Sequence, residues 1–235
     1  MSRTHLGVLL LAAAAIVSIP AAAQEKASQI PVETFMRRAE NTRMTLSPNG
    51  QLLAGLTPVN GRDNLVVVDI SKRTKTVITS LKDYDVVEFH WVSDQRILFR
   101  VADGKDALGQ AEYAGTYAID VDGRDIRDLN KIGAFVVPLR RKGGDEMYVS
   151  MALRRREASD PYVLNTRTGR YHLMVEEAPA ETRRWILDWK GVPRVAVAVD
   201  PAAAKTLVWY RDDEKSPWVN LSEYDAGMGD VDFVN

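Results

Sequence analysis

The sequence predicts an all-β protein with the fold of a β-propeller. Two patterns that repeat in phase lead to this prediction, and helical signals are scarce. In the first pattern a polar turn precedes an apolar run, as at Gly50. Comparable turns recur near residues 91–94, at Gly144 and at Gly191, at a period of about 47 residues. The one helix-like stretch, residues 32–40, precedes the repeats.

The second pattern marks the end of the third strand in each repeat. An apolar run ends there in a polar residue, and the run ends are about 45 to 51 residues apart. Four short strands in a unit of this length are typical of one propeller blade. The alternative is a β-sandwich with coincidental spacing, but a sandwich gives no reason for two markers that keep one phase. The run ends are Asp69, Asp120, Asn165 and Arg211.

Each repeat contains four segments rich in Val, Ile, Tyr, Trp and Thr and bounded by Gly, Asn, Asp or Pro, as strands commonly are. The predicted blades cover residues 42–81, 86–130, 134–175 and 184–222. The predicted strands are 43–46, 51–56, 65–70 and 76–80; 86–91, 96–101, 115–120 and 126–129; 135–139, 146–151, 161–164 and 171–174; and 185–188, 194–199, 206–210 and 218–221. Polar residues separate the third strand from the fourth in every repeat, so we expect a tight, solvent-facing hairpin there.

The first 23 residues have the pattern of a secretory signal peptide. Arg3 and His5 precede an apolar run over residues 6–19, and small residues precede Gln24. A membrane-spanning helix needs roughly 20 apolar residues, so the alternative of an uncleaved anchor is less favoured. The sequence therefore predicts export, most simply to a bacterial periplasm, with membrane contact only during export.

We expect the two ends of the mature chain to differ from complete blades. Residues 24–41 are predicted to form a lead-in segment, with a short helix that Pro31 opens. Residues 231–235 resemble the first strand of a fifth blade. Because a propeller has to close, we expect an incomplete propeller of four blades and one strand, belonging to a longer protein.

Composition excludes several classes of function. The chain has 235 residues, 46% of them hydrophobic, with no cysteine and a net charge of -1. Without cysteine there are no disulfides, thiolate zinc sites or cysteine nucleophiles. A near-neutral charge gives no electrostatic footprint for nucleic acid. No glycine-rich loop opens a helix, so no phosphate-binding motif and no cofactor are expected.

Three segments near the start of the mature chain resemble exported bacterial peptidases of the prolyl oligopeptidase family, of the dipeptidyl-aminopeptidase or acylaminoacyl-peptidase kind. The head segment and the loop rich in Pro, Asn and Gly make the resemblance more specific than the Ser-Pro-Asn-Gly turn, which TolB-like propellers share. The segments read Ile-Pro-Val-Glu-Thr-Phe-Met-Arg-Arg at 30–38, Leu-Ser-Pro-Asn-Gly-Gln-Leu-Leu-Ala at 46–54 and Thr-Pro-Val-Asn-Gly-Arg-Asp-Asn-Leu at 57–65.

The resemblance implies an N-terminal propeller above a C-terminal α/β-hydrolase domain that acts on short peptides. Such a hydrolase carries a Gly-x-Ser-x-Gly nucleophile followed by Asp and His. No serine of this chain has that context, and its mature part contains only His90 and His172. No catalytic residue is therefore assigned. Glu176 and Glu177 form a pair but lack the Asp-Trp-x-Tyr-Glu-Glu context that holds a substrate's amino terminus in the dipeptidyl-peptidase branch.

The remaining polar candidates favour structural roles. His90 is predicted to pack between blades, with a channel position as the alternative, and His172 is predicted at the surface. With no further histidine or cysteine at ligand spacing, no metal site is expected. Residues 140–142 and 154–156 are basic and suggest a rim around the third blade that meets acidic peptide ends or a partner. The favoured interpretation is a solvated hairpin with arginines paired to Glu157 and Asp160.

The tryptophans and glycines also have structural interpretations. The tryptophans recur at blade positions, so we expect packing between blades rather than ligand stacking, and the glycines are expected in turns. The tryptophans are Trp91, Trp185, Trp189, Trp209 and Trp218. The glycines are Gly143, Gly144, Gly227 and Gly229.

We predict that the purified chain does not hydrolyse aminoacyl chromogenic peptides, because it contains no serine in a nucleophile motif. The assay is release of the chromophore with and without a serine-protease inhibitor. Turnover that the inhibitor abolishes would contradict this prediction.

Overall fold

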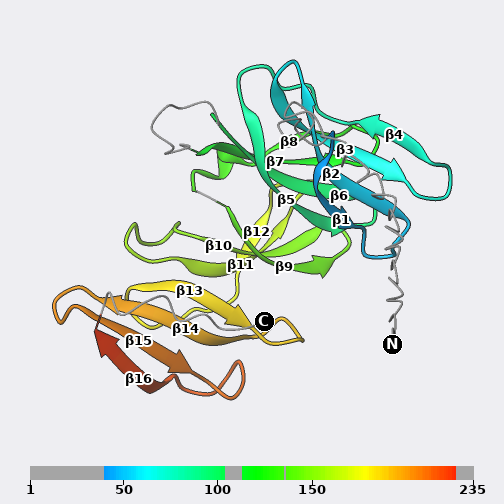
Figure 1. Ribbon diagram of the computed structural model, residues 1–235. Coiled ribbons are helices and arrows are strands. Elements are labelled where there is room, and N and C mark those ends of the chain that lie inside the picture. Colours follow the sequence, from blue (N-terminus) through cyan, green and yellow to red (C-terminus); the bar gives the residue numbers. More distant parts are fainter. Residues whose placement is uncertain (1–39, 104–112, 135, 226–235) are drawn as a thin grey trace, which may run out of the picture. The chain divides into compact units, whose positions relative to one another are not determined.

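The computed structural model describes residues 40–103, 113–134 and 136–225. These residues form four four-stranded antiparallel sheets, each made of strands consecutive in the sequence (Figure 1). This arrangement confirms the predicted β-propeller fold class. The described residues include one short 3-10 turn, Asn130–Ile132, and no helix among them is long and apolar enough to cross a membrane.

Each sheet is a blade, and the strands follow the order of the sequence from one edge to the other. Blade 1 consists of β1 (Thr42–Leu46), β2 (Leu52–Val59), β3 (Arg62–Asp69) and β4 (Thr74–Val77). Blade 2 consists of β5 (Asp85–Ser93), β6 (Arg96–Ala102), β7 (Tyr113–Asp120) and β8 (Arg127–Asp128). Blade 3 consists of β9 (Val137–Gly143), β10 (Glu146–Met151), β11 (Asp160–Asn165) and β12 (Tyr171–Leu173). Blade 4 consists of β13 (Thr182–Leu187), β14 (Pro193–Asp200), β15 (Lys205–Tyr210) and β16 (Val219–Asp225).

Several predicted features lie outside the described residues. These are the signal peptide at 1–23, nearly all of the lead-in segment and its helix over 32–40, the strand at 231–235, and Gly227 and Gly229. Phe135, the first residue of a predicted strand, also lies outside them.

The hairpin between β2 and β3 is longer than the sequence predicts. The residues between the expected strands 51–56 and 65–70 are paired almost to the tip, with Val59 opposite Arg62. Asn60 and Gly61 alone form the turn, with φ angles of 52° and 76°. Two-residue turns of this kind need a positive φ at both positions, which Asn and Gly adopt readily. The Asn-Gly pair therefore extends two strands where a loop was expected.

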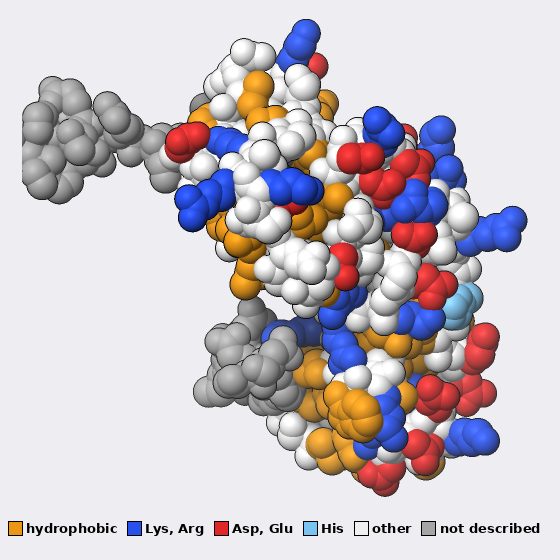
Figure 2. All heavy atoms as spheres, turned by 90° about the vertical axis from the view of Figure 1, so that its right-hand side faces the viewer, with side chains coloured by type: hydrophobic (Ala, Val, Ile, Leu, Met, Phe, Trp, Pro, Cys, Tyr) orange, Lys and Arg blue, Asp and Glu red, His pale blue; other side chains and the backbone are white. Residues whose placement is uncertain are grey.

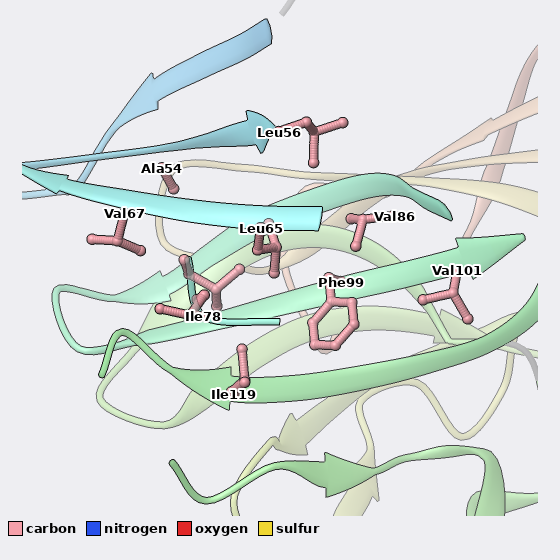
Figure 3. Packing of buried hydrophobic residues seen from close by; sticks show 10 residues of the cluster. Ala54, Leu56, Leu65, Val67, Ile78, Val86, Phe99, Val101 and Ile119 are labelled. Carbon is pink, nitrogen blue, oxygen red and sulfur yellow. The ribbon is translucent and has the colours of Figure 1, made fainter. Parts of the chain in front are cut away.

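Side chains of β6 show how neighbouring blades share a core. All seven residues of this strand are buried, so both faces of its sheet are covered. Ile97, Phe99 and Val101 pack with Leu65 and other residues of blade 1. Leu98 points to the opposite face and joins a cluster with residues of blade 3. Figure 3 shows the first of these clusters from close by.

The junction between blades 2 and 3 contains a fully buried arginine. The Arg96 guanidinium donates a hydrogen bond of 2.7 Å to the Asp120 carboxylate on its own blade. It also donates to the hydroxyl and the carbonyl oxygen of Thr166 on blade 3, at 3.1 and 3.0 Å. Arg96 is 0% exposed, so these bonds replace water around its charge. One side chain therefore connects two blades.

Arg167 extends this network toward the surface. It donates to both carboxylate oxygens of Asp120 at 3.1 Å and to Asp145 at 2.9 Å, and it also pairs with Asp125. Asp120 thus accepts bonds from one arginine of blade 2 and one of blade 3. Such a carboxylate neutralises buried positive charge that would otherwise be costly.

We expect Asp120→Asn to lower the free energy of unfolding by about 2–4 kcal/mol, because the buried Arg96 would lose its nearer carboxylate and keep only Asp125, at 3.4 Å. Urea denaturation followed by tryptophan fluorescence measures the change. Asp122→Asn is the matched control: Asp122 lies two residues further on, and its ion pair with Arg124 is 3.7 Å long and exposed. Its carboxylate also accepts a 2.9 Å hydrogen bond from the Arg124 backbone, which an asparagine side-chain oxygen can accept as well. Its effect should stay within about 0.5 kcal/mol.

The pH dependence gives a second readout of the same network. Burial by itself raises the pKa of Asp120, but hydrogen bonds from Arg167 and Arg96 outweigh it and hold this pKa below its usual value. The resulting stability is present above the unfolded-state pKa of about 4 and is lost as pH falls through the folded-state pKa. The Asn variant should therefore lose less stability than the unmodified chain below about pH 4. Equal losses in both proteins would contradict this role of Asp120.

Candidate functional site

The first strands of the blades provide the most distinctive surface. β1, β5, β9 and β13 are each an edge of their sheet, and β9 contacts both β5 and β13. Side chains of one first strand also reach the backbone of the next: the Trp91 indole N–H donates to the Thr45 carbonyl at 3.3 Å. The four edges are thus held beside one another by contacts between neighbouring blades.

A cleft of about 550 Å³ lies between β9 and β13. Consecutive residues of both strands line it, although successive side chains of a strand point to opposite faces. The cleft therefore lies against the strand edges, where backbone groups do not take part in the sheet. The lining residues are Pro138, Leu139 and Arg140 of β9 and Arg184, Trp185, Ile186 and Leu187 of β13.

The guanidinium of Arg140 is fixed at this cleft by the turn that follows β13. It donates hydrogen bonds to the carbonyl oxygens of Asp188 and Trp189. Both partners are uncharged, so Arg140 keeps its positive charge beside the cleft. In the half of the molecule that carries β9 to β16, Lys and Arg side chains lie directly beside hydrophobic ones (Figure 2).

The prediction that Trp189 packs between blades is wrong. Its side chain is 78% exposed, because it lies in the turn after β13, where the chain has left the sheet. The other four tryptophans pack as expected. Trp185 is buried beside blade 3, with the partly buried Trp209 and Trp218 packed against the same cluster, and Trp91 packs against the cluster between blades 1 and 2. The packed tryptophans and Trp189 differ in their position within the blade. The sequence did not resolve this position at residue 189.

His90 is not buried between blades. Its side chain is 38% exposed, and its Nε2 lies 2.8 Å from the Glu88 carboxylate on the same strand. The hydrogen bond with His90, supported by one from Arg100, holds the pKa of Glu88 below its usual value. His172 is exposed in β12, as predicted. The alternative position of His90 beside a channel stays a prediction.

The basic segments have mainly structural roles. Arg154 donates two hydrogen bonds, of 2.9 and 2.7 Å, to the buried Asp160 carboxylate, and Arg155 approaches the same group at 3.7 Å. This confirms the predicted pairing with Asp160. In the other segment Lys142 forms an ion pair of 2.5 Å with Glu146.

Glu176 and Glu177 act through their backbone. The carbonyl of Glu176 accepts a hydrogen bond from Arg154, and that of Glu177 accepts one from the Trp218 indole. Both side chains are exposed. The pair therefore helps to close the junction between blades 3 and 4.

A second cavity, of about 410 Å³, lies between the turns of blade 4. Acidic and basic residues both line it, and Arg194 pairs with Asp188 at 3.2 Å. Burial raises the pKa of Asp188, but hydrogen bonds from the Val192 backbone and Arg194 outweigh it and lower the pKa overall. Asp188 and Arg194 thus neutralise each other. Among the described residues no cluster of His, Asp or Glu could hold a metal ion.

Comparison with known proteins supports the fold. No protein-family model and no curated protein matches the sequence. An oligogalacturonate lyase in complex with manganese superposes with a TM-score of 0.51 at 13% identity, over 80% of this chain and 55% of that one. TolB from Acinetobacter baumannii gives 0.45 at 18% identity, over 76% and 42%. The acylaminoacyl peptidase of Pyrococcus horikoshii gives 0.46 at 13%, over 74% and 31%.

The chain is a β-propeller. At these identities the likeness shows the fold and no activity. The chain also spans little more than half the length of the lyase, and less of the other two structures.

We expect Gly191→Ala to disturb the turn that presents its carbonyls to Arg140. Gly191 has a φ of 86°, and an added Cβ would lie 2.1 Å from the Tyr148 hydroxyl oxygen. Backbone strain and this clash should together cost about 2–4 kcal/mol of unfolding free energy, measured by urea denaturation.

Gly144→Ala is the matched control for this variant. Gly144 also lies in a first hairpin and has a φ of 56°, but an added Cβ would meet no atom within 4 Å. Backbone strain alone should cost about 1 kcal/mol. Equal losses in the two variants would show that contact with Tyr148 does not constrain the turn.

Proposed function

We propose that this chain is the substrate-gating propeller of an exported serine peptidase of the prolyl oligopeptidase family. The observation that carries the proposal is the resemblance of residues 30–38, 46–54 and 57–65 to that family. The second segment runs from the last residue of β1 into β2, and the third runs from the end of β2 into the first half of β3, so both lie in blade 1. The fold agrees with the propeller that the family resemblance implies.

The proposed role of the blades is steric. A propeller above an active site would admit short or unfolded peptides and exclude folded proteins. This role requires blades that stay together. The shared cores and the network of Arg96 and Asp120 are contacts of the kind that such a role needs.

The chemistry would belong to an α/β-hydrolase domain, because no serine of these 235 residues has the Gly-x-Ser-x-Gly context. That domain would supply a serine nucleophile, a histidine base and an oxyanion hole for acyl transfer. Neither histidine of the mature chain has such a setting, because His172 is exposed and His90 is bonded to Glu88. The proposed compartment, the periplasm, follows from the signal-peptide pattern of residues 1–23.

A TolB-like periplasmic scaffold is the second candidate. The observation that favours it is the Ser-Pro-Asn-Gly turn, which such propellers share. Here Ser47 accepts a hydrogen bond from Leu52, and the Asn49 backbone donates one of 2.8 Å to Asp94 of blade 2. The turn therefore has a structural role that needs no hydrolase.

An activity-based probe distinguishes the two functions. Cells that make the protein are fractionated, and exported proteins are treated with a biotinylated fluorophosphonate, which labels active serine hydrolases. Captured proteins are digested and searched for peptides of blades 1 to 4. We expect these peptides in the labelled sample and their loss after heat denaturation. If an antibody to the blades detects the protein in the fraction but the probe does not label it, the peptidase function is wrong and the scaffold is favoured.

A further inference from the structure

We propose that Asn60, at the tip of the hairpin between β2 and β3, is a site of spontaneous deamidation and isomerisation. The reaction takes place within the chain and uses water as its only co-reactant. It is faster here than at Asn49, the other asparagine of the sequence that precedes a glycine. The site stands on residues of blade 1, so it does not depend on the proposed peptidase function.

An asparagine that precedes a glycine can react with the peptide bond between them. The nitrogen of Gly61 attacks the side-chain carbonyl carbon of Asn60, and the new C–N bond closes a cyclic imide. The side-chain nitrogen leaves as ammonia and takes the proton of the Gly61 N–H. Water then adds to one of the two imide carbonyls and opens the ring, which gives aspartate or isoaspartate. Glycine favours the reaction because it has no Cβ beside the attacking nitrogen.

The reacting groups at the hairpin tip are exposed and unbonded. Asn60 and Gly61 are both exposed, and they alone form the turn. In the part of the chain that the structure describes, no hydrogen bond holds the Asn60 side chain or the Gly61 N–H. The turn can therefore rearrange for the attack when the pairing of Val59 with Arg62 opens. Hairpin tips belong to the least stable parts of a fold, so such opening is frequent.

The Asn49-Gly50 pair is exposed as well, but hydrogen bonds hold both of its reacting groups. Asn49 Oδ1 accepts hydrogen bonds from the Ser47 hydroxyl at 2.8 Å and the Gln51 N–H at 3.0 Å. The Gly50 N–H donates to the Ser47 carbonyl at 2.9 Å. Each bond that has to break lowers the population of the reactive turn by about fivefold. Hydrogen bonding, not exposure, thus separates the two pairs.

The isoaspartate product would disturb the hairpin more than the aspartate product. Aspartate keeps the length of the backbone, and Asp-Gly suits the same two-residue turn. Isoaspartate adds one carbon to the backbone before Gly61, so the turn no longer fits strands that are paired to the tip. β3 begins directly after the turn with Arg62, which forms ion pairs with Asp85 at 2.9 Å and Asp103 at 2.8 Å. The modification therefore occurs beside a contact between blades 1 and 2.

Mass spectrometry of the full chain tests the proposal. Trypsin releases both pairs in one peptide, residues 44–62, and fragmentation of this peptide compares the two sites in the same molecule. After incubation of the folded chain at mildly alkaline pH, we expect deamidation at Asn60 at least about tenfold faster than at Asn49. In guanidinium chloride the two rates should be similar. Equal rates in the folded chain, no reaction at Asn60, or a difference that persists after denaturation would overturn the proposal.

Two serine variants of blade 1 test the protection of Asn49. Ser47→Ala removes the hydroxyl that donates to Asn49, and deamidation at Asn49 should become about fivefold faster while the rate at Asn60 changes less than about twofold. Ser71→Ala is the matched control, because its hydroxyl donates to Asp69 in another turn, and it should change neither rate. Thermal denaturation checks that both variants are folded. An unchanged rate at Asn49 in folded Ser47→Ala would overturn the role of the hydrogen bonds. The comparison of folded and denatured unmodified chain needs no variant, so it decides the proposal even if Ser47→Ala does not fold.

Discussion

Every sheet of this protein depends on its neighbours to cover its faces. β6 illustrates the constraint, because all of its residues are buried although successive side chains point in opposite directions. Phe99 packs toward blade 1 and Leu98 toward blade 3, so the strand belongs to two cores at once. A four-stranded sheet alone would leave both of these faces in water. Burial between blades is therefore the interaction on which the fold, the junctions and the cleft depend.

Polar junctions add specificity to this apolar packing. Arg96 lies on the same face of β6 as Leu98, yet it reaches the backbone of Thr166 and a carboxylate shared with Arg167. Apolar side chains tolerate small displacements, whereas a buried guanidinium with fixed acceptors does not. The junction between blades 2 and 3 is thus defined by directional bonds. Among the described residues, the cluster at the junction between blades 3 and 4 has fewer fully buried side chains, and this junction contains the cleft.

The sequence was sufficient to predict the blades but not the surface between them. Strand patterns and turn residues are local, so the repeats can be recognised in the sequence. The Asn60-Gly61 pair is also a local signal, of a two-residue hairpin turn. The cleft depends on two strands about 45 residues apart, and no local pattern brings Leu139 next to Ile186. Trp189 shows the same limit: its repeat position suggested packing, but its exposure is decided by where β13 ends.

Arg140 is bonded to the turn after β13. The position of its charge in the cleft therefore depends on the width of the cleft. The carbonyl oxygens of Asp188 and Trp189 belong to blade 4, whereas the guanidinium belongs to blade 3. If the two blades moved apart, the arginine would lose these acceptors and its fixed position together. These two bonds therefore fix the distance between blades 3 and 4 at the point where the guanidinium crosses from one to the other.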